Sequence, residues 1–143
     1  MTNQTIEAEI KKAEKRGKAR VKQTGEVFTP MDLCRQMVHE IPEEKLKDPN
    51  TTYLDNSCGD GNFLAALYEI LTKEFGHDGT HVLNHQLYGV DLMPDNISTV
   101  RDRLGILPDM EAWNHIVCAD ALAYDYSFEP ESQTSMVEEL GVR

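Results

Sequence analysis

The sequence has few cysteines, few basic residues and no long apolar run, and each shortage excludes a class of protein. Its three cysteines, Cys34, Cys58 and Cys118, are an odd number without a Cys-x-x-Cys pair, which argues against a disulfide framework and a thiolate zinc site. No apolar run approaches the roughly 18 residues of a membrane-spanning helix. Residues 1–12 lack the apolar centre of a signal peptide. We therefore expect a cytoplasmic protein with no membrane partner.

Basic residues are also concentrated at one end of the chain. The 143 residues include 14 Lys and Arg against 25 Asp and Glu, a net charge of -11. Residues 1–24 carry seven basic and three acidic side chains, whereas the rest of the chain carries seven basic and 22 acidic ones. An acidic body repels a phosphate backbone, so we expect DNA contact only through the basic arm, residues 11–22, or within a larger assembly. For the arm itself we favour the other interpretation, a solvated helix end, since charge runs usually face water.

Length and hydrophobic content indicate one α/β domain with a polar segment at each end. With 40% hydrophobic residues, the chain is able to bury one core. We divide it into a basic helical arm (1–23), an α/β domain (24–126) and a polar tail (127–143). Within the domain, strand and helix signals alternate, a pattern that produces right-handed crossovers and a parallel sheet.

The alternation can be followed along the domain. Apolar residues at helical spacing run from Phe63 to Phe75, and a second such helix begins at Pro94. Short apolar stretches that end in an acidic residue are typical of buried strands in such a domain. Strands are therefore expected at 51–55, 87–91 and 115–120.

One more helix is expected ahead of the first strand. Thr29 is placed to be its N-cap, Pro30 fits its first position and Asp32 fits the capping-box position. The polar residues 42–50 and the glycine- and histidine-containing residues 76–85 are expected to be loops. The buried face of the helix is expected to consist of Leu33, Met37, Val38 and Ile41.

The three predicted strands end in Asp55, Asp91 and Asp120. In an open α/β sheet, ligands bind beyond the carboxyl ends of the strands, and here the first strand runs into a glycine turn, residues 56–61 (Asn-Ser-Cys-Gly-Asp-Gly). A dinucleotide site requires Gly-x-Gly-x-x-Gly, but Leu64 replaces the third glycine. A P-loop is excluded because no Gly-Lys-Ser/Thr follows the turn.

This pattern predicts a ligand that is nucleoside-like, lacks phosphates and tolerates a negative pocket. S-adenosyl-L-methionine meets all three conditions, because its sulfonium and amino groups are cationic and its ribose offers two hydroxyls to a carboxylate. Asp91, 30 residues past Gly61, stands where such a carboxylate belongs. The alternative is that end-of-strand acids only cap helices or solvate loops. Three of them in register beside a Gly-x-Gly turn favour the cofactor site.

Several ordered motifs resemble the adenine-specific (N6) DNA methyltransferases, in particular the modification subunits of restriction systems. Residues 24–30, Thr-Gly-Glu-Val-Phe-Thr-Pro, resemble a family segment that ends in Tyr/Phe-Thr-Pro. Residues 55–64, Asp-Asn-Ser-Cys-Gly-Asp-Gly-Asn-Phe-Leu, resemble the signature Asp-Pro-Ala-Cys-Gly-Ser-Gly-x-Phe-Leu, while 89–92 and 119–122 resemble the ribose- and adenine-binding acids. The resemblance covers residues 21–125. It implies a partial Rossmann-like methyltransferase fold, the N-terminal half of the parallel sheet with its flanking helices.

The resemblance also implies roles for individual residues toward the cofactor. Asp55 and the backbone of residues 57–61 would hold its methionine portion, since glycine permits close approach. Residues 28–30 would close over the methionine tail. Asp91 would accept hydrogen bonds from the ribose, with Leu92 against the adenine face. Asp120 would accept one from the adenine amine, with the Ala121 amide near a ring nitrogen. The implied cofactor-binding residues are Phe28, Thr29, Pro30, Asp55, Ser57, Cys58, Gly59, Gly61, Asp91, Leu92, Asp120 and Ala121.

Two substitutions and one absence distinguish this chain from the family pattern. Asn56 and Asp60 replace the usual Pro and Ser, and the role of Asp60 stays open. The motif Asn/Asp-Pro-Pro-Tyr/Phe, which binds a flipped adenine in this family, is absent because no two of the six prolines are adjacent. We therefore assign no catalytic residue. Methyl transfer to the exocyclic amine of adenine is expected only if further chain or a partner supplies the motif.

Comparison with the family also predicts an exposed sheet edge. A complete sheet would place a fourth strand beside the first, and without it that edge is open. We expect either a homo-oligomer or a second methyltransferase chain to cover it. Two other hypotheses stay open. One is a catalytically inactive module that sequesters the cofactor or regulates a full methyltransferase, and the other is a small-molecule methyltransferase, which the Phe-Thr-Pro segment disfavours.

Three histidines raise the question of a metal site. His77, His81 and His85 recur every four residues, a helical ligand spacing. Gly76 and Gly79 argue against a helix there. We therefore expect a solvated loop and no metal.

Overall fold

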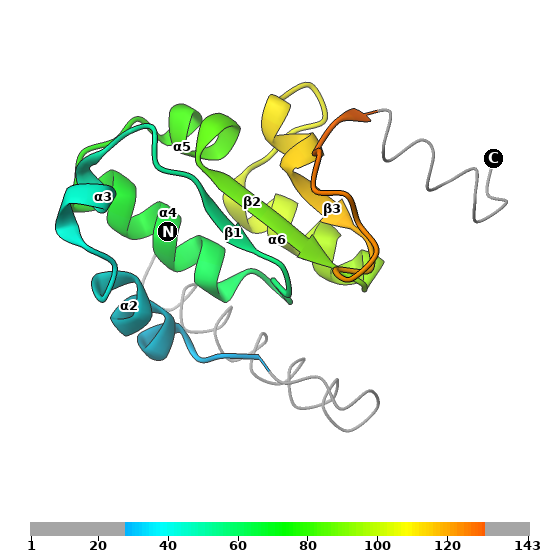
Figure 1. The fold of residues 1–143 in the computed structure, drawn as a ribbon, viewed down its shortest axis with the longest axis horizontal. Helices are drawn as coiled ribbons and strands as arrows, with labels where there is room; N and C mark the ends of the chain where they lie inside the picture. The colour runs from blue at the N-terminus through cyan, green and yellow to red at the C-terminus, as the bar shows by residue number, and fades with distance from the viewer. Residues whose placement is uncertain (1–27, 131–143) are drawn as a thin grey trace, which may run out of the picture.

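The computed structural model describes residues 28–130, in which helices and parallel strands alternate (Figure 1). The basic arm, residues 24–27 of the first motif and residues 131–143 lie outside the described residues. None of the described helices combines the length and hydropathy of a membrane span. The elements are α2 (Met31–His39), α3 (Glu43–Lys47), β1 (Tyr53–Asp55), α4 (Asn62–Lys73), α5 (Gly79–His85), β2 (Leu87–Asp91), α6 (Pro94–Leu104), the 3-10 helix η1 (Glu111–His115) and β3 (Ile116–Cys118).

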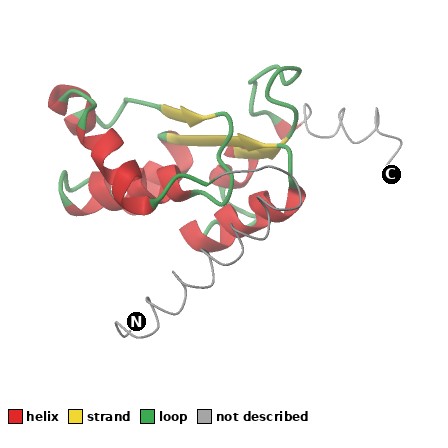
Figure 2. Ribbon diagram, turned by 90° about the horizontal axis from the view of Figure 1, so that it is seen from below, coloured by secondary structure: helices red, strands yellow, loops and turns green. Residues whose placement is uncertain are grey.

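The three strands form a parallel sheet in the order β1-β2-β3. Tyr53 pairs with Leu87, and Gly89 pairs with Ile116. Both crossovers step in the same direction, so right-handed connections place α4 and α6 on one face of the sheet, as Figure 2 shows from the side. The carboxyl ends of the strands therefore meet at one edge. This arrangement confirms the α/β class and the partial Rossmann-like methyltransferase fold.

The core lies between the sheet and these helices. Leu64, Leu67 and Leu71 of α4 are fully buried, and the buried apolar residues of α6 are at most 9% exposed. Both helices therefore turn an apolar face to the core, although the ends of the predicted run, Phe63 and Phe75, are only partly buried. The opposite face of β2 and β3 is covered by the residues that follow β3. There Tyr124 packs with Val90, and further aromatic residues up to position 128 pack against this second cluster.

The start of α2 differs from the sequence prediction. Its N-cap is Pro30, not Thr29, and no described side chain caps it. The Thr29 carbonyl instead accepts a hydrogen bond from Nδ2 of Asn62 at 2.7 Å. Asp32 does not complete a capping box but forms an ion pair with Arg35 at 3.0 Å. The reason is that the backbone before α2 is bound to the start of α4, which shifts the first helical turn by one residue.

The apolar face of α2 was also only partly predicted. Cys34 and Val38 are buried and pack against α4, but Leu33 is 47% exposed and Met37 is 44% exposed. In Figure 1 the helix lies outside β1, on the side away from β2. Only the side of α2 that faces α4 therefore meets the described core.

Both segments that were predicted to be loops contain a short helix. Within 42–50, α3 is anchored by buried Leu46. Within 76–85, α5 begins after Asp78, whose side chain accepts a hydrogen bond from the His81 amide. Gly79 occupies the first helical position rather than the interior, so it does not interrupt the helix. Of the strands, 87–91 was predicted correctly, whereas the first and third are shorter than expected.

Strand β1 lies at one edge of the described sheet. β2 occupies one side of β1, and none of the described strands pairs with its other side. Gly89 of β2 faces Leu64 of α4. Side chains alternate along a strand, so Tyr88 and its partner Leu54 lie on the face opposite α4. It is 49% exposed. Within residues 28–130, the edge of β1 is thus open, and the sheet face beside it is uncovered at Leu54.

Candidate functional site

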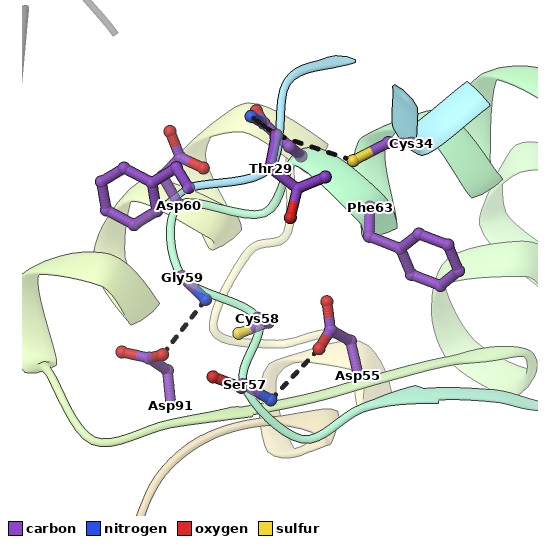
Figure 3. Close-up of a pocket in the computed structure, with 11 residues that line it drawn as sticks. Thr29, Cys34, Asp55, Ser57, Cys58, Gly59, Asp60, Phe63 and Asp91 are labelled. Atoms are coloured by element: carbon purple, nitrogen blue, oxygen red, sulfur yellow. Dashed lines mark hydrogen bonds between the residues drawn. The ribbon is translucent and has the colours of Figure 1, made fainter. Parts of the chain in front are cut away.

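A pocket lies at the carboxyl ends of β1 and β2, between the glycine turn and the residues that precede α2 (Figure 3). Its cavity volume is about 70 Å³, much less than the roughly 300–1,000 Å³ of a site that encloses a drug-sized ligand. It is therefore large enough for one end of such a ligand only. The lining residues are Phe28, Thr29, Cys34, Asp55, Ser57, Cys58, Gly59, Asp60, Asn62, Phe63 and Asp91.

The turn is held by hydrogen bonds to the ends of two strands. The Ser57 amide donates to Oδ1 of Asp55 at 3.1 Å, which bends the chain as β1 ends. The Cys58 amide donates to the Val90 carbonyl at 3.0 Å and extends the pairing with β2 by one further bond. The backbone of the turn is thereby fixed beside the pocket before any ligand is bound.

Glycine is required at two positions of the turn. Gly59 has φ +54, and a Cβ there would lie 2.8 Å from the ring of Phe28. Gly61 has φ +91, and a Cβ there would lie 2.9 Å from Cγ2 of Val100 on α6. Positive φ strains other residues. The first glycine thus lets Phe28 lie against the turn, and the second lets α6 pack beneath it.

The Asp91 carboxylate accepts three hydrogen bonds and is 8% exposed. Its Oδ1 accepts from the Gly59 amide at 3.1 Å. Its Oδ2 accepts from the Met93 amide at 3.0 Å and from Nδ2 of Asn96 at 2.9 Å. A carboxylate has about four lone-pair positions, so about one is left for a ligand. Asp91 is therefore also an anchor of the turn.

Asp55 has a different environment from Asp91. Burial raises the pKa of its carboxyl, the Ser57 amide opposes this, and the neighbouring Asp91 raises it further. Burial also raises the pKa of the Cys58 thiol, with Asp91 and Asp55 acting in the same direction. Cys58 is thus a neutral, buried thiol and not a nucleophile.

The structure answers the question left open for Asp60. This residue is 3% exposed, and its Oδ1 lies 3.9 Å from Nη1 of Arg103 on α6. The same Nη1 donates to the Asp60 carbonyl at 2.9 Å and to Oδ1 of Asn62 at 2.8 Å. Because Asn62 in turn donates to Thr29, these contacts connect α6, the start of α4 and the segment before α2.

Sequence reasoning missed Asn62, Asn96 and Arg103. The signal for Asn96 was available, because positions 96 and 100 share one face of α6 and Val100 is an obvious core residue. A polar residue on the buried face of a helix calls for a polar partner. The partner of Asn96, Asp91, lies only five residues earlier at the end of β2. The turn that Arg103 contacts is distant along the chain and is brought to α6 only by the fold.

The residues predicted to contact adenine lie outside this pocket. Leu92 is 66% exposed at the end of β2. Asp120 follows β3 in a turn, where its Oδ1 accepts from the Leu122 amide at 2.9 Å. The Cys118 thiol donates to the Leu92 carbonyl at 3.4 Å, which connects the two strand ends. Of the predicted site, the structure does not bring Pro30, Gly61, Leu92, Asp120 and Ala121 into the pocket lining.

The three histidines have structural contacts. Nε2 of His77 lies 2.6 Å from the Leu46 carbonyl, and Nε2 of His81 lies 2.7 Å from the Pro49 carbonyl. His85 lies near Glu111, with Nδ1 3.7 Å from Oε2. The prediction of a solvated loop was therefore wrong. No cluster of three potential metal ligands is found within residues 28–130.

Comparison with known proteins identifies the family of the chain. The family model for N-6 DNA methylases matches residues 13–137, a range that includes the pocket and all three strands. Members of this family depend on S-adenosyl-L-methionine. No curated protein sequence matches the chain significantly. Because the family match extends over most of the 143 residues, the chain belongs to the N-6 DNA methylase family.

Proposed function

We propose that this chain is the S-adenosyl-L-methionine-binding core of a DNA adenine-N6 methyltransferase. The observation that carries the proposal is the pocket in which Asp55, Asp91 and the glycine turn meet at the strand ends. Since the sequence has no adjacent prolines, the Asn/Asp-Pro-Pro-Tyr/Phe motif must come from further chain or from a partner. The chain alone then binds the cofactor but does not transfer its methyl group.

The charge of the pocket favours a cationic ligand. Arg103 lies beside Asp60, but neither Asp55 nor Asp91 has an ion-pair partner within residues 28–130. A cation near Asp55 would relieve the cost of burying its charge, the same cost that raises its pKa. The amino and sulfonium groups of S-adenosyl-L-methionine supply such charges, whereas nucleotide phosphates would be repelled.

The pocket dimensions suggest how the cofactor lies. The methionine end fits the cavity between Asp55 and Thr29, which Figure 3 shows on opposite sides of the opening. The ribose then reaches the remaining acceptor position of Asp91. The adenine lies outside the pocket, against exposed Leu92 and near Asp120 at the end of β3. In this arrangement the chain's residues bind and orient the cofactor, so that its methyl group faces the base that another component presents.

We also propose that a second methyltransferase chain, or further chain of the same protein, covers the open edge of β1. Leu54 of β1 and Leu33 and Met37 of α2 are each close to half exposed. α2 lies beyond this edge, on the side away from β2 (Figure 1). A strand added to β1 would pair its backbone groups, and apolar side chains packed beside it would remove these three from water. DNA binding belongs to the assembled protein, with the basic arm, residues 11–22, as a contact.

Calorimetric titration of S-adenosyl-L-methionine into the purified chain tests the proposal. Asp55→Asn removes the charge but keeps an acceptor for the Ser57 amide, and we expect it to weaken binding by about ten- to hundredfold. Asp109→Asn, the same change at an exposed acid, is the matched control. A folded wild-type chain that does not bind the cofactor would refute the proposal for this chain alone. Transfer of labelled methyl groups to DNA by the chain alone would refute the need for a second component.

A further inference from the structure

The most deeply buried polar side chain near the pocket is one that the proposed cofactor does not reach. Asn96, in the first turn of α6, is 0% exposed. Its Nδ2 donates to Oδ2 of Asp91 at 2.9 Å. Fully buried asparagine is uncommon and normally has a specific hydrogen-bond partner. Here the partner is the carboxylate that also anchors the glycine turn.

The contacts of Asp91 form a short relay from α6 to the turn. Asn96 and the Met93 amide both donate to Oδ2, which fixes the plane of the carboxylate. Oδ1 is then directed at the Gly59 amide, 3.1 Å away. Gly59 in turn lies under the ring of Phe28 at the pocket wall. A rotation of the Asp91 carboxylate would therefore displace the turn at the pocket.

We infer that Asn96 is a positioning residue of the cofactor site, which orients Asp91 and through it holds Gly59 in place. This inference rests on the proposed function, because it states how the same site is kept ready for the cofactor. Asn96 itself does not touch the ligand. Its contribution is that Asp91 already has the correct orientation when the ribose arrives, so no binding free energy is spent on reordering the turn.

The substitution Asn96→Asp tests this relay with almost no change of shape. It replaces the donor that faces Asp91 with a second carboxylate at the same distance. Two carboxylates this close share a proton, so one pKa of the pair is raised. Below that pKa the shared proton restores an O–H donor to Asp91. Above it, both groups are charged and repel each other, and the bond to Gly59 is lost. Affinity should therefore fall as pH rises.

Other titratable groups near Asp91 must be controlled for. Asp55 at the end of β1, Cys58 in the turn and Cys118 on β3 are each coupled to Asp91, and all three have raised pKa values. Asp95 precedes Asn96 on α6. All of these groups are unchanged in the variant. Wild type carries the same groups, so a pH dependence that is seen only in the variant originates from the new carboxylate.

The experiment is a titration of S-adenosyl-L-methionine at pH 6 and pH 8 into wild type, Asn96→Asp and Asn50→Asp. At pH 8 we expect Asn96→Asp to bind about ten- to hundredfold more weakly than wild type, the cost of one lost hydrogen bond to a charged group. At pH 6 the loss should be smaller, because a larger fraction of the pairs carries the shared proton. Asn50→Asp makes the same change at an exposed asparagine and should follow wild type at both values.

A second measurement separates this inference from the proposed function. Amide hydrogen exchange at Gly59 reports on these contacts without any ligand. After correction for intrinsic rates, Asn96→Asp should exchange faster than wild type, by a larger factor at pH 8 than at pH 6. Wild type that binds the cofactor, with equal affinity and equal Gly59 protection in Asn96→Asp, would overturn the positioning role. Wild type that does not bind refutes the proposed function, and the exchange result then decides the positioning of Gly59 by itself.

Discussion

Replacing Asp91 with asparagine should destabilise the fold strongly, although the two side chains have nearly the same shape. In the wild type, the Asp91 carboxylate accepts hydrogen bonds from the Gly59 amide, the Met93 amide and Nδ2 of Asn96. Asparagine has one oxygen and one NH₂ group, which must face a donor in either orientation. The better orientation keeps the oxygen toward Met93 and Asn96, so the Gly59 amide then meets an NH₂ group.

The cost follows from the contacts that are lost. One hydrogen bond to a charged group contributes about 1.5–3 kcal/mol, and a buried donor left without an acceptor costs about 1–3 kcal/mol. We therefore expect Asp91→Asn to lower the free energy of unfolding by about 3 kcal/mol or more. For a domain of this size, that corresponds to a decrease in Tm of about 10–20 °C.

Thermal unfolding followed by circular dichroism at pH 7 measures this effect. Asp120→Asn, at an exposed acid whose Oδ1 accepts from the Leu122 amide, is the control and should change Tm little. If Asp91→Asn unfolds within a degree or two of wild type, Asp91 does not anchor the turn and this reasoning is wrong. The expected result also means that loss of cofactor binding in an Asp91 variant is not evidence of a ribose contact unless the variant is shown to be folded.

Two other substitutions test the packing of the site and the open edge. Gly61→Ala should lower the free energy of unfolding by about 2 kcal/mol, because φ is +91 and the new Cβ would lie 2.9 Å from Val100. Urea unfolding measures this change, and a midpoint equal to that of wild type would show that position 61 is not strained by alanine. Leu54→Lys should leave the stability of the isolated chain within about 0.5 kcal/mol of wild type, since Leu54 is 49% exposed. The same variant should weaken any association through β1, as seen by sedimentation, and equal association would argue against this edge as the interface.

Much of the fold could be predicted from the sequence because strand, turn and helix signals are local. The strand 87–91 and the inward residues of α4 and α6 follow from apolar periodicity alone. Periodicity does not reveal what lies opposite a helix. For this reason Leu33 and Met37 were assigned to a buried face, although nothing within residues 28–130 covers them fully. The helix α5 was missed because Gly79 was treated as an interior residue, whereas it follows the capping residue Asp78.

The site was predicted less completely than the fold, because its order depends on individual side-chain contacts between elements and not on a periodic pattern. The glycine turn and its flanking acids form a continuous motif, so the pocket itself could be located. Asn96 and Arg103 are single polar residues in an otherwise ordinary helix. Their importance comes from Asp91 and Asp60, which they reach in three dimensions. The sequence pattern also predicted similar roles for the three strand-end acids. In the structure Asp91 anchors the turn, Asp55 lines the pocket and Asp120 lies outside the pocket lining.

These three acids should respond differently to the same change, and Asp55→Asn is the informative case. The raised pKa of Asp55 means that its charged form is disfavoured in the folded chain. For an acid of this kind, folding is penalised above the folded-state pKa, and the penalty disappears as pH falls through the usual aspartate pKa of about 3.9. Asp55→Asn should therefore raise Tm at pH 7 while weakening cofactor binding, and its advantage over wild type should vanish near pH 3.5. Thermal unfolding of Asp55→Asn and wild type at both pH values measures this difference in Tm. A lower Tm at pH 7 would mean that the Asp55 charge stabilises the ligand-free fold. The idea that a cationic ligand relieves an unfavourable buried charge at Asp55 would then be wrong.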